Sequence, residues 1–162
     1  MKKIIQRGFF VISIILVSAS FQVYAGEKPI QLALFTPIQI FPETDSITGF
    51  RFNLLYGRNA AVTGLDLGLV NHSTGQFKGV QFGFVGISDS DFLGWQDNAV
   101  NIVSGQFEGL QVGLFNYAKR VRGVQFGGVN YAGSITGLQI GLVNIIRQGG
   151  FLPVCIIVNG SF

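Results

Sequence analysis

The feature that most constrains the fold of this chain is an eight-residue motif that recurs at nearly constant spacing. Its clearest copy reads Gly137-Leu-Gln-Ile-Gly-Leu-Val-Asn144. Copies begin at residues 49, 64, 79, 94, 109, 123 and 137, and a degenerate copy begins at residue 152. The successive steps are 15, 15, 15, 15, 14, 14 and 15 residues. A fixed period indicates a repeat architecture in which each copy forms one structural unit.

Residues alternate in character within each copy. Leu138, Ile140 and Leu142 share one parity, and Gly137 and Gln139 share the other. A period of two predicts β-strand, and the glycines would weaken any helix. Turn-forming Gly, Asp and Ser lie midway between copies. We therefore expect an all-β fold of about eight short strands, each followed by a short turn.

Three motif positions hold one residue type in most copies, and we interpret them as structural repeat positions. The first is glycine in Gly64, Gly79, Gly109, Gly123 and Gly137. The third is glutamine in Gln81, Gln111, Gln125 and Gln139. The eighth is asparagine in Asn71, Asn101, Asn116, Asn130 and Asn144. Arg51 and Asp66 occupy the glutamine position, which predicts a salt bridge if adjacent strands pair there.

Two architectures fit this pattern, and the first is an antiparallel meander closed into a small outer-membrane-type barrel. Alternating strands, short turns and an export signal are typical of such barrels. The chain also ends on an alternating strand with the aromatic residue Phe162, which resembles a barrel-assembly signal. In this reading Leu138, Ile140 and Leu142 face lipid, while Gly and Gln line a narrow lumen.

The alternative is a small parallel β-solenoid with one repeat per coil. Every copy reads in the same direction, whereas a meander more naturally repeats as a two-strand hairpin. In a solenoid the motif asparagines would stack into an amide ladder at a coil corner. A coil of this length must turn at least twice, however, and only one turn per repeat is obvious. Asp97, at an apolar-face position, is awkward in both architectures.

The N-terminal segment predicts export. Lys2, Lys3 and Arg7 precede the apolar run of residues 9–17, and Val23-x-Ala25 provides a cleavage site. This order defines a secretory signal peptide, and the run is short for a spanning helix. We expect a signal peptide over residues 1–25 and one β-repeat domain over residues 26–162, with its repeats at about 49–162.

Charge and cysteine content exclude several classes of protein. The net charge of +3 comes from the first 25 residues, because the remaining chain has eight basic and eight acidic residues. A nucleic-acid partner would require a clustered basic face on the mature protein, and none is indicated. Cys155 is the only cysteine, so no intrachain disulfide can form.

The search for chemistry yields no catalytic, cofactor or metal site. His72 is the only histidine and is interpreted as an exposed turn residue, and Cys155 as a buried, inert thiol. Asp89, Asp91 and Asp97 form the only acidic cluster, which we interpret as turn-forming residues in preference to a weak calcium site. A basic turn at residues 119–122 is interpreted as solvated, with acidic head groups as the alternative contact.

The motif, the segment 35–42 and the ending at residues 149–162 together resemble the "surface repeat-containing" proteins of Gram-negative envelopes. That resemblance spans nearly the whole mature chain and implies an envelope or cell-surface location without an established activity. The copies containing Gly86, Asp97 and Gly128 depart from the pattern.

We therefore expect a non-enzymatic structural or interaction protein of the outer membrane or cell surface. Its expected partners are outer-membrane lipid and the barrel-assembly machinery, with no nucleic acid, cofactor or identified small-molecule substrate. Two alternative functions are a small pore or lipid-binding barrel, and a soluble exported solenoid, periplasmic or secreted, that binds a polymer on its Gly/Gln face.

Overall fold

The computed structural model describes residues 27–162, which form seven strands and no helix. The predicted signal peptide lies outside these residues. Within them, no helix meets the length and apolarity needed to cross a bilayer. The strands are β1 (Glu27–Phe35), β2 (Ile38–Gln39), β3 (Ser46–Asn59), β4 (Val62–Ser73), β5 (Phe77–Ser88), β6 (Phe92–Gln148) and β7 (Val154–Ser161).

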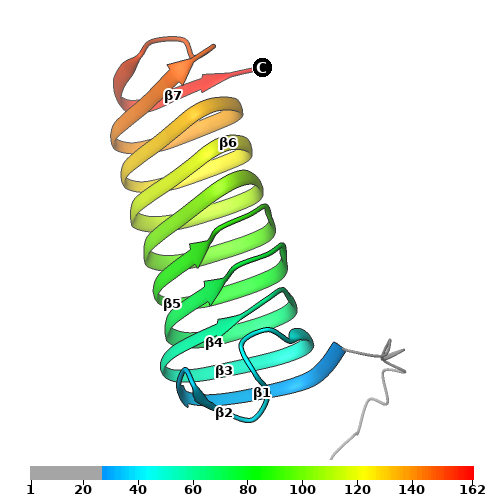
Figure 1. The fold of residues 1–162 in the computed structure, drawn as a ribbon. Helices are drawn as coiled ribbons and strands as arrows, with labels where there is room; N and C mark the ends of the chain where they lie inside the picture. The colour runs from blue at the N-terminus through cyan, green and yellow to red at the C-terminus, as the bar shows by residue number, and fades with distance from the viewer. Residues whose placement is uncertain (1–26) are drawn as a thin grey trace, which may run out of the picture.

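The chain winds into a parallel β-solenoid, so the prediction of an antiparallel barrel is wrong (Figure 1). β3, β4, β5 and β6 pair in parallel, and each pairing sets the motif glycines side by side, as in Gly64 with Gly79 and Gly79 with Gly94. The sheet order β2-β1-β3-β4-β5-β6-β7 does not close on itself. Parallel coils stack each motif position on the same position of the next copy. An antiparallel meander would reverse every second copy and lose that match.

The expectation of eight separate short strands is also wrong, because β6 alone runs for 57 residues. Its backbone stays extended through several coils, as the continuous ribbon in Figure 1 shows. Side-chain hydrogen bonds between equivalent residues of successive coils give the length of one coil. The Gln96 amide donates to Gln81, 15 residues earlier, and the Gln125 amide donates to Gln111, 14 residues earlier. The repeat period read from the sequence is thus the length of one coil.

The second bend of each coil lies inside the motif, where no turn residue marks it. Gln139 and Asn144 are both fully buried although their positions differ by five, an odd number, so the strand alternation slips once between them. The asparagine side chain spans this corner. Asn144 donates to the carbonyl of Gly141 at 3.0 Å, and Asn101 donates to that of Asn98 at 3.1 Å. Asparagine is suited to the corner because its side chain bonds nearby backbone groups.

The interior has an apolar half and a polar half. The apolar half contains two stacks of buried residues, which precede the motif glycine by two positions or follow the motif asparagine by two. These residues are Ile47, Val62, Phe77, Phe92, Phe107, Val121 and Ile135, together with Val103, Ala118, Ala132 and Ile146. The rings of Phe77 and Phe92 stack with their centroids 4.4 Å apart. The polar half contains the motif glutamines and asparagines.

Both ends of the solenoid are covered by the chain itself. At the start, the Gln31 side chain bonds both the carbonyl and the N–H of Phe41, at 2.8 and 3.0 Å, and Phe41 packs against the apolar core. At the end, β7 reverses direction and pairs antiparallel with β6. The Asn159 amide donates to the carbonyl of Leu152 at 2.8 Å. These caps satisfy backbone groups that open coil ends would leave without partners.

Candidate functional site

The motif glutamines and asparagines form two buried hydrogen-bonded ladders. Gln81, Gln96, Gln111, Gln125 and Gln139 are fully buried, and each of the last four donates to the one before it at 2.7–3.0 Å. The asparagine ladder expected of a solenoid is also present, with 2.8 Å bonds linking Asn101 successively to residues 116, 130 and 144. The motif glutamines, on which the polymer-binding alternative relied, therefore lie in the interior of the coil.

The motif glycines permit the close stacking of coils. Gly64, Gly79, Gly109, Gly123 and Gly137 all have φ between +125° and +138°, a region that L side chains rarely adopt. A Cβ on Gly123 would collide with the carbonyl of Gly109 on the preceding coil. The conformation and the contact each require glycine at this position.

The departure at Gly86 is compensated by a neighbouring residue. Gly86 occupies a ladder position where the motif has asparagine, and Asn98 occupies a position where the motif has glycine. The Asn98 amide fills the vacated space and donates to Asn101 at 2.7 Å and to Gln81 at 3.2 Å. Asn53 and Gly57 make the same exchange within β3. The irregular copies thus preserve the polar interior.

Of the two residues singled out for chemistry, His72 lies in β4 and Cys155 in β7. The His72 side chain is 16% exposed, so the prediction of an exposed turn residue is wrong. It is 2.9 Å from both the Tyr56 hydroxyl and the Asp89 carboxylate. Burial raises the pKa of the Tyr56 phenol, which disfavours its anionic, nucleophilic form. Cys155 is half-exposed, which overturns the prediction of a buried thiol.

The three predicted acidic residues occupy different environments. Asp89 contacts His72, and Asp91 accepts a hydrogen bond from the backbone N–H of Gln106 at 2.7 Å. Asp97 lies beside Phe82 in the neighbouring coil and borders a hollow lined by Leu114 and Phe126. Across residues 27–162, no three His, Cys, Asp or Glu side chains converge in a way that could hold a metal ion.

The most extensive unusual surface is an apolar face on the outside of the coils. It consists of the outward residues at motif positions two, four and six. The large exposed members are Phe52, Leu54, Leu65, Leu69, Phe84, Trp95, Leu110, Leu114, Phe126 and Leu142. Ile30, Leu32 and Leu34 of β1 extend the face toward the start of the solenoid. We call this surface the apolar face.

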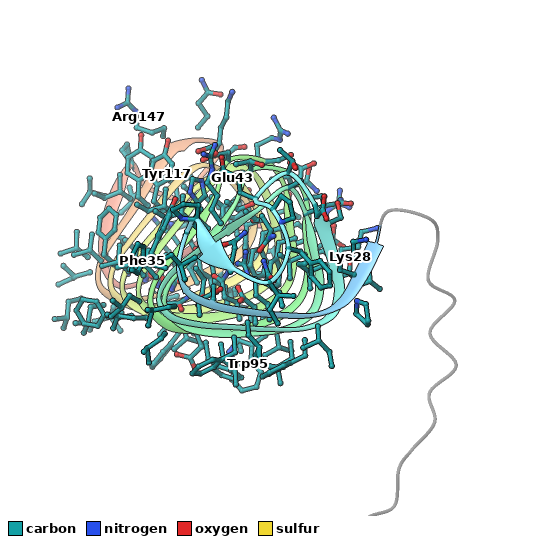
Figure 2. The ribbon with its side chains drawn as sticks, turned by 60° about the horizontal axis from the view of Figure 1, so that its bottom comes forward. Lys28, Phe35, Glu43, Trp95, Tyr117 and Arg147 are labelled. Atoms are coloured by element: carbon teal, nitrogen blue, oxygen red, sulfur yellow. The ribbon has the colours of Figure 1, made fainter. Side chains whose placement is uncertain are left out.

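The barrel prediction placed these side chains outward around a narrow lumen, whereas in the solenoid they lie outside a filled interior. Figure 2 shows Trp95 on one side of the coil and Glu43, Tyr117 and Arg147 on the opposite side. The molecule is therefore amphipathic about its long axis. Its interior is filled by glutamine, asparagine and a second set of apolar residues, so the motif aliphatics remain on the surface.

A hollow of about 380 Å³ interrupts the apolar face. It forms where small residues, Ala99 and Gly128, occupy the sixth motif position on either side of Leu114. Asp97 lines the hollow and is the only charged residue at the face-forming positions. Its outward, partly exposed position removes the difficulty that the sequence pattern raised for this carboxylate.

Phe162 follows β7 and its side chain is 97% exposed. Its interpretation as a barrel-assembly signal depended on a barrel, which the solenoid replaces. The last strand nevertheless remains strongly apolar on its surface, with Val154, Ile156 and Ile157 all exposed.

The fold and these surfaces define a class, the self-capped parallel β-solenoid with an amphipathic exterior. No protein-family model matches the chain, and neither a curated protein nor a solved structure matches it significantly.

Proposed function

We propose that this chain is an exported, non-enzymatic structural protein of the outer membrane or cell surface, and that its apolar face rests on lipid. The observation that carries the proposal is the length of that face, which extends from β1 to Leu142 along a capped solenoid and is interrupted by the hollow beside Leu114. The signal-peptide pattern and the resemblance to envelope surface-repeat proteins support the location.

The dimensions of the apolar face suit a membrane surface. Coils stack about 4.8 Å apart and residues along a strand rise about 3.3 Å, so motif positions two to six of seven copies form a face of roughly 30 by 13 Å. This area is in the range of the largest apolar patch of a typical monomer, and such patches often mark protein or membrane contacts. The exposed side chains are aliphatic and aromatic, which favours a solvent that offers no hydrogen bonds.

A lipid occupant is favoured over a protein partner by the repetition of this face. The face-forming motif positions repeat along the solenoid. Position six holds large apolar side chains in five of the seven copies, Leu54, Leu69, Phe84, Leu114 and Leu142, with Ala99 and Gly128 at the hollow. A repeated surface offers a protein partner no unique register, whereas a lipid layer requires none. Asp97 is the one residue that opposes insertion, because a carboxylate loses hydration in an apolar medium.

The single tryptophan allows a direct test. Trp95 is 41% exposed and lies on the apolar face. We would mix purified protein lacking residues 1–25 with vesicles of phosphatidylethanolamine and phosphatidylglycerol. The proposal requires a blue shift of Trp95 emission, quenching by brominated acyl chains, and flotation of the protein with the vesicles. Unchanged emission with all protein in the soluble fraction would reject lipid contact.

Two matched variants test whether the apolar face is the surface that binds vesicles. Leu114→Glu places a charge on a side chain that is already 72% exposed, so the fold should persist. We expect its vesicle affinity to fall at least tenfold, about 1.4 kcal/mol. Ser104→Glu adds the same charge at an exposed position in the row of Arg147, on the opposite side, and should leave affinity unchanged. Equal losses from both variants would indicate simple repulsion by charged lipid.

Asp97→Asn separates lipid from a protein partner. Removing the charge lowers the desolvation penalty, so binding to lipid should strengthen. A protein partner that presents a cation to this carboxylate would instead bind the variant more weakly. The direction of the change therefore identifies the kind of surface that the apolar face contacts.

A further inference from the structure

A second candidate site lies on the polar side of the solenoid, away from the apolar face. It is a cleft of about 510 Å³ at the edges of three successive coils. Its lining residues are Tyr117, Lys119, Arg120, Tyr131, Gly133, Ser134, Arg147 and Gln148. Figure 2 shows Tyr117 and Arg147 together on the side opposite Trp95. We call this the cationic cleft.

The shape of the cleft follows from the repeat. Lys119, Gly133 and Arg147 occupy the same position on consecutive coils, 14 residues apart. The central glycine leaves a gap between two long cationic side chains whose backbones are roughly 10 Å apart, two coil spacings. A side chain cannot fill this gap easily, because a Cβ on Gly133 would meet the carbonyl of Lys119.

The polar groups of the cleft are uncommitted. Within residues 27–162, the side chains of Tyr117, Lys119, Arg120, Tyr131 and Arg147 make no hydrogen bond or ion pair with the protein, and neither do those of Ser134 and Gln148. The buried amides of the same coils are, by contrast, almost all bonded. Side chains that converge without partners are available to a ligand.

The charged residues around the cleft indicate that its ligand is an anion. Residues 109–162 contain four basic residues and no Asp or Glu. The nearest acid in the sequence, Glu108, pairs with Arg122 at 4.0 Å and does not line the cleft. Three cations therefore face one hollow without a neutralising carboxylate. Guanidinium groups match phosphate oxygens in bidentate geometry, and an ammonium adds a point charge.

The remaining groups indicate what carries the phosphate. Tyr117 and Tyr131 stack at 5.1 Å with an interplanar angle of 17°, so their facing rings are covered and the hydroxyl ends remain for contact. The tyrosine and serine hydroxyls and the glutamine amide can both donate and accept hydrogen bonds. This mixture suits a hydroxyl-rich sugar. We propose that the cationic cleft binds a phosphorylated saccharide, free or as a lipid-borne head group.

To test the proposal, we would titrate purified protein lacking residues 1–25 with glucose 1-phosphate, inorganic phosphate or glucose. Binding would be measured by calorimetry and NMR. We expect saturable binding of the sugar phosphate, at least tenfold tighter than of phosphate or glucose alone. Arg147→Gln should weaken it tenfold or more. Lys78→Gln removes the same charge from an exposed site on β5 and should change it less than twofold. Tyr131→Phe should weaken the sugar phosphate but not inorganic phosphate.

A parallel arm uses vesicles that contain lipopolysaccharide, compared with phosphatidylethanolamine vesicles. Suppose that the protein binds the lipopolysaccharide vesicles, that Arg147→Gln abolishes this binding, and that the free sugar phosphate does not bind. The ligand is then a lipid-borne head group. Equal losses in Arg147→Gln and Lys78→Gln would reduce the effect to net charge and overturn the proposal. So would equal affinity for phosphate and sugar phosphate, or an absence of saturable binding in both arms. Leu114→Glu changes the apolar face and leaves the cationic cleft intact. Loss of lipid binding by the apolar face can therefore be distinguished from loss of ligand binding by the cleft.

Discussion

Arg51 and Asp66 form a doubly hydrogen-bonded ion pair inside the polar half of the coil, with both bonds at 2.7 Å and both side chains fully buried. The salt bridge predicted from their shared motif position is thereby confirmed. Asp66 also accepts a hydrogen bond from Gln81 at 2.9 Å, and Arg51 donates to the carbonyl of His72 at 2.9 Å. The pair thus replaces two rungs of the glutamine ladder with charged ones.

This arrangement predicts opposite outcomes for single and double substitutions. Asp66→Gln or Arg51→Gln alone leaves one buried charge without its partner and should cost about 3–5 kcal/mol of unfolding free energy. The double variant restores the glutamine found at this position in later coils and should recover most of that loss. Urea unfolding of the four proteins measures the coupling. Additive single losses would show that the two charges are independently solvated.

The stacking of motif glycines predicts a position-dependent effect of alanine. Gly123→Ala combines a positive φ of +133° with a collision against the Gly109 carbonyl and should destabilise the fold by about 2–5 kcal/mol. Gly149 provides the control, since its φ is +75° and no atom lies within 4 Å of an added Cβ. Gly149→Ala should cost about 1 kcal/mol. Thermal unfolding followed by circular dichroism would contradict this account if the two losses were equal.

The exchange between Gly86 and Asn98 predicts non-additive stability. Gly86→Asn alone would drive its side chain into Gln81 and Asn98 and should cost about 1–3 kcal/mol. Combined with Asn98→Gly, it restores the motif residue at both positions, and stability should return to within about 1 kcal/mol of the parent. A double-mutant cycle by urea unfolding measures the coupling, and a double variant as unstable as the sum of both singles would refute compensation.

Tyr56 predicts a loss of stability in alkaline solution. Burial, with smaller contributions from Glu43 and Asp89, raises the pKa of its phenol above the ordinary value of 10.0. The native state therefore holds this proton more tightly than the unfolded state does. The resulting stabilisation is complete below pH 10 and is lost as pH rises through the native pKa. Urea midpoints should show the stability difference between parent and Tyr56→Phe narrowing over this range; a constant difference would exclude the phenol as its cause.

Much of the local structure was accessible from the sequence because each coil repeats the same chemistry. The period, the β conformation, the shared parity of Gln139 with Gly137 and the Arg51–Asp66 contact all follow from motif spacing. The solenoid alternative placed the motif asparagines at a coil corner, and Asn144 lies at such a corner. The sequence shows no turn residue there because the bend uses a side chain in place of Gly or Pro. The cationic cleft was only partly visible, since Arg147 is 27 residues from Arg120 and joins it through coil stacking.

What the sequence by itself determined is therefore the repeating unit, which specifies strands, coil length and the residues of each row. Only the tertiary structure decided which parity faces inward. Alternation along the strand is the same in an antiparallel barrel and in a parallel solenoid. It does not by itself decide which of the two parities is buried. Parallel stacking allows the motif glutamines, and the asparagines from Asn101 to Asn144, to bond their copies on neighbouring coils, so the polar parity is buried and hydrogen-bonded. The aliphatic parity is left outside as a face that the protein can present to its surroundings.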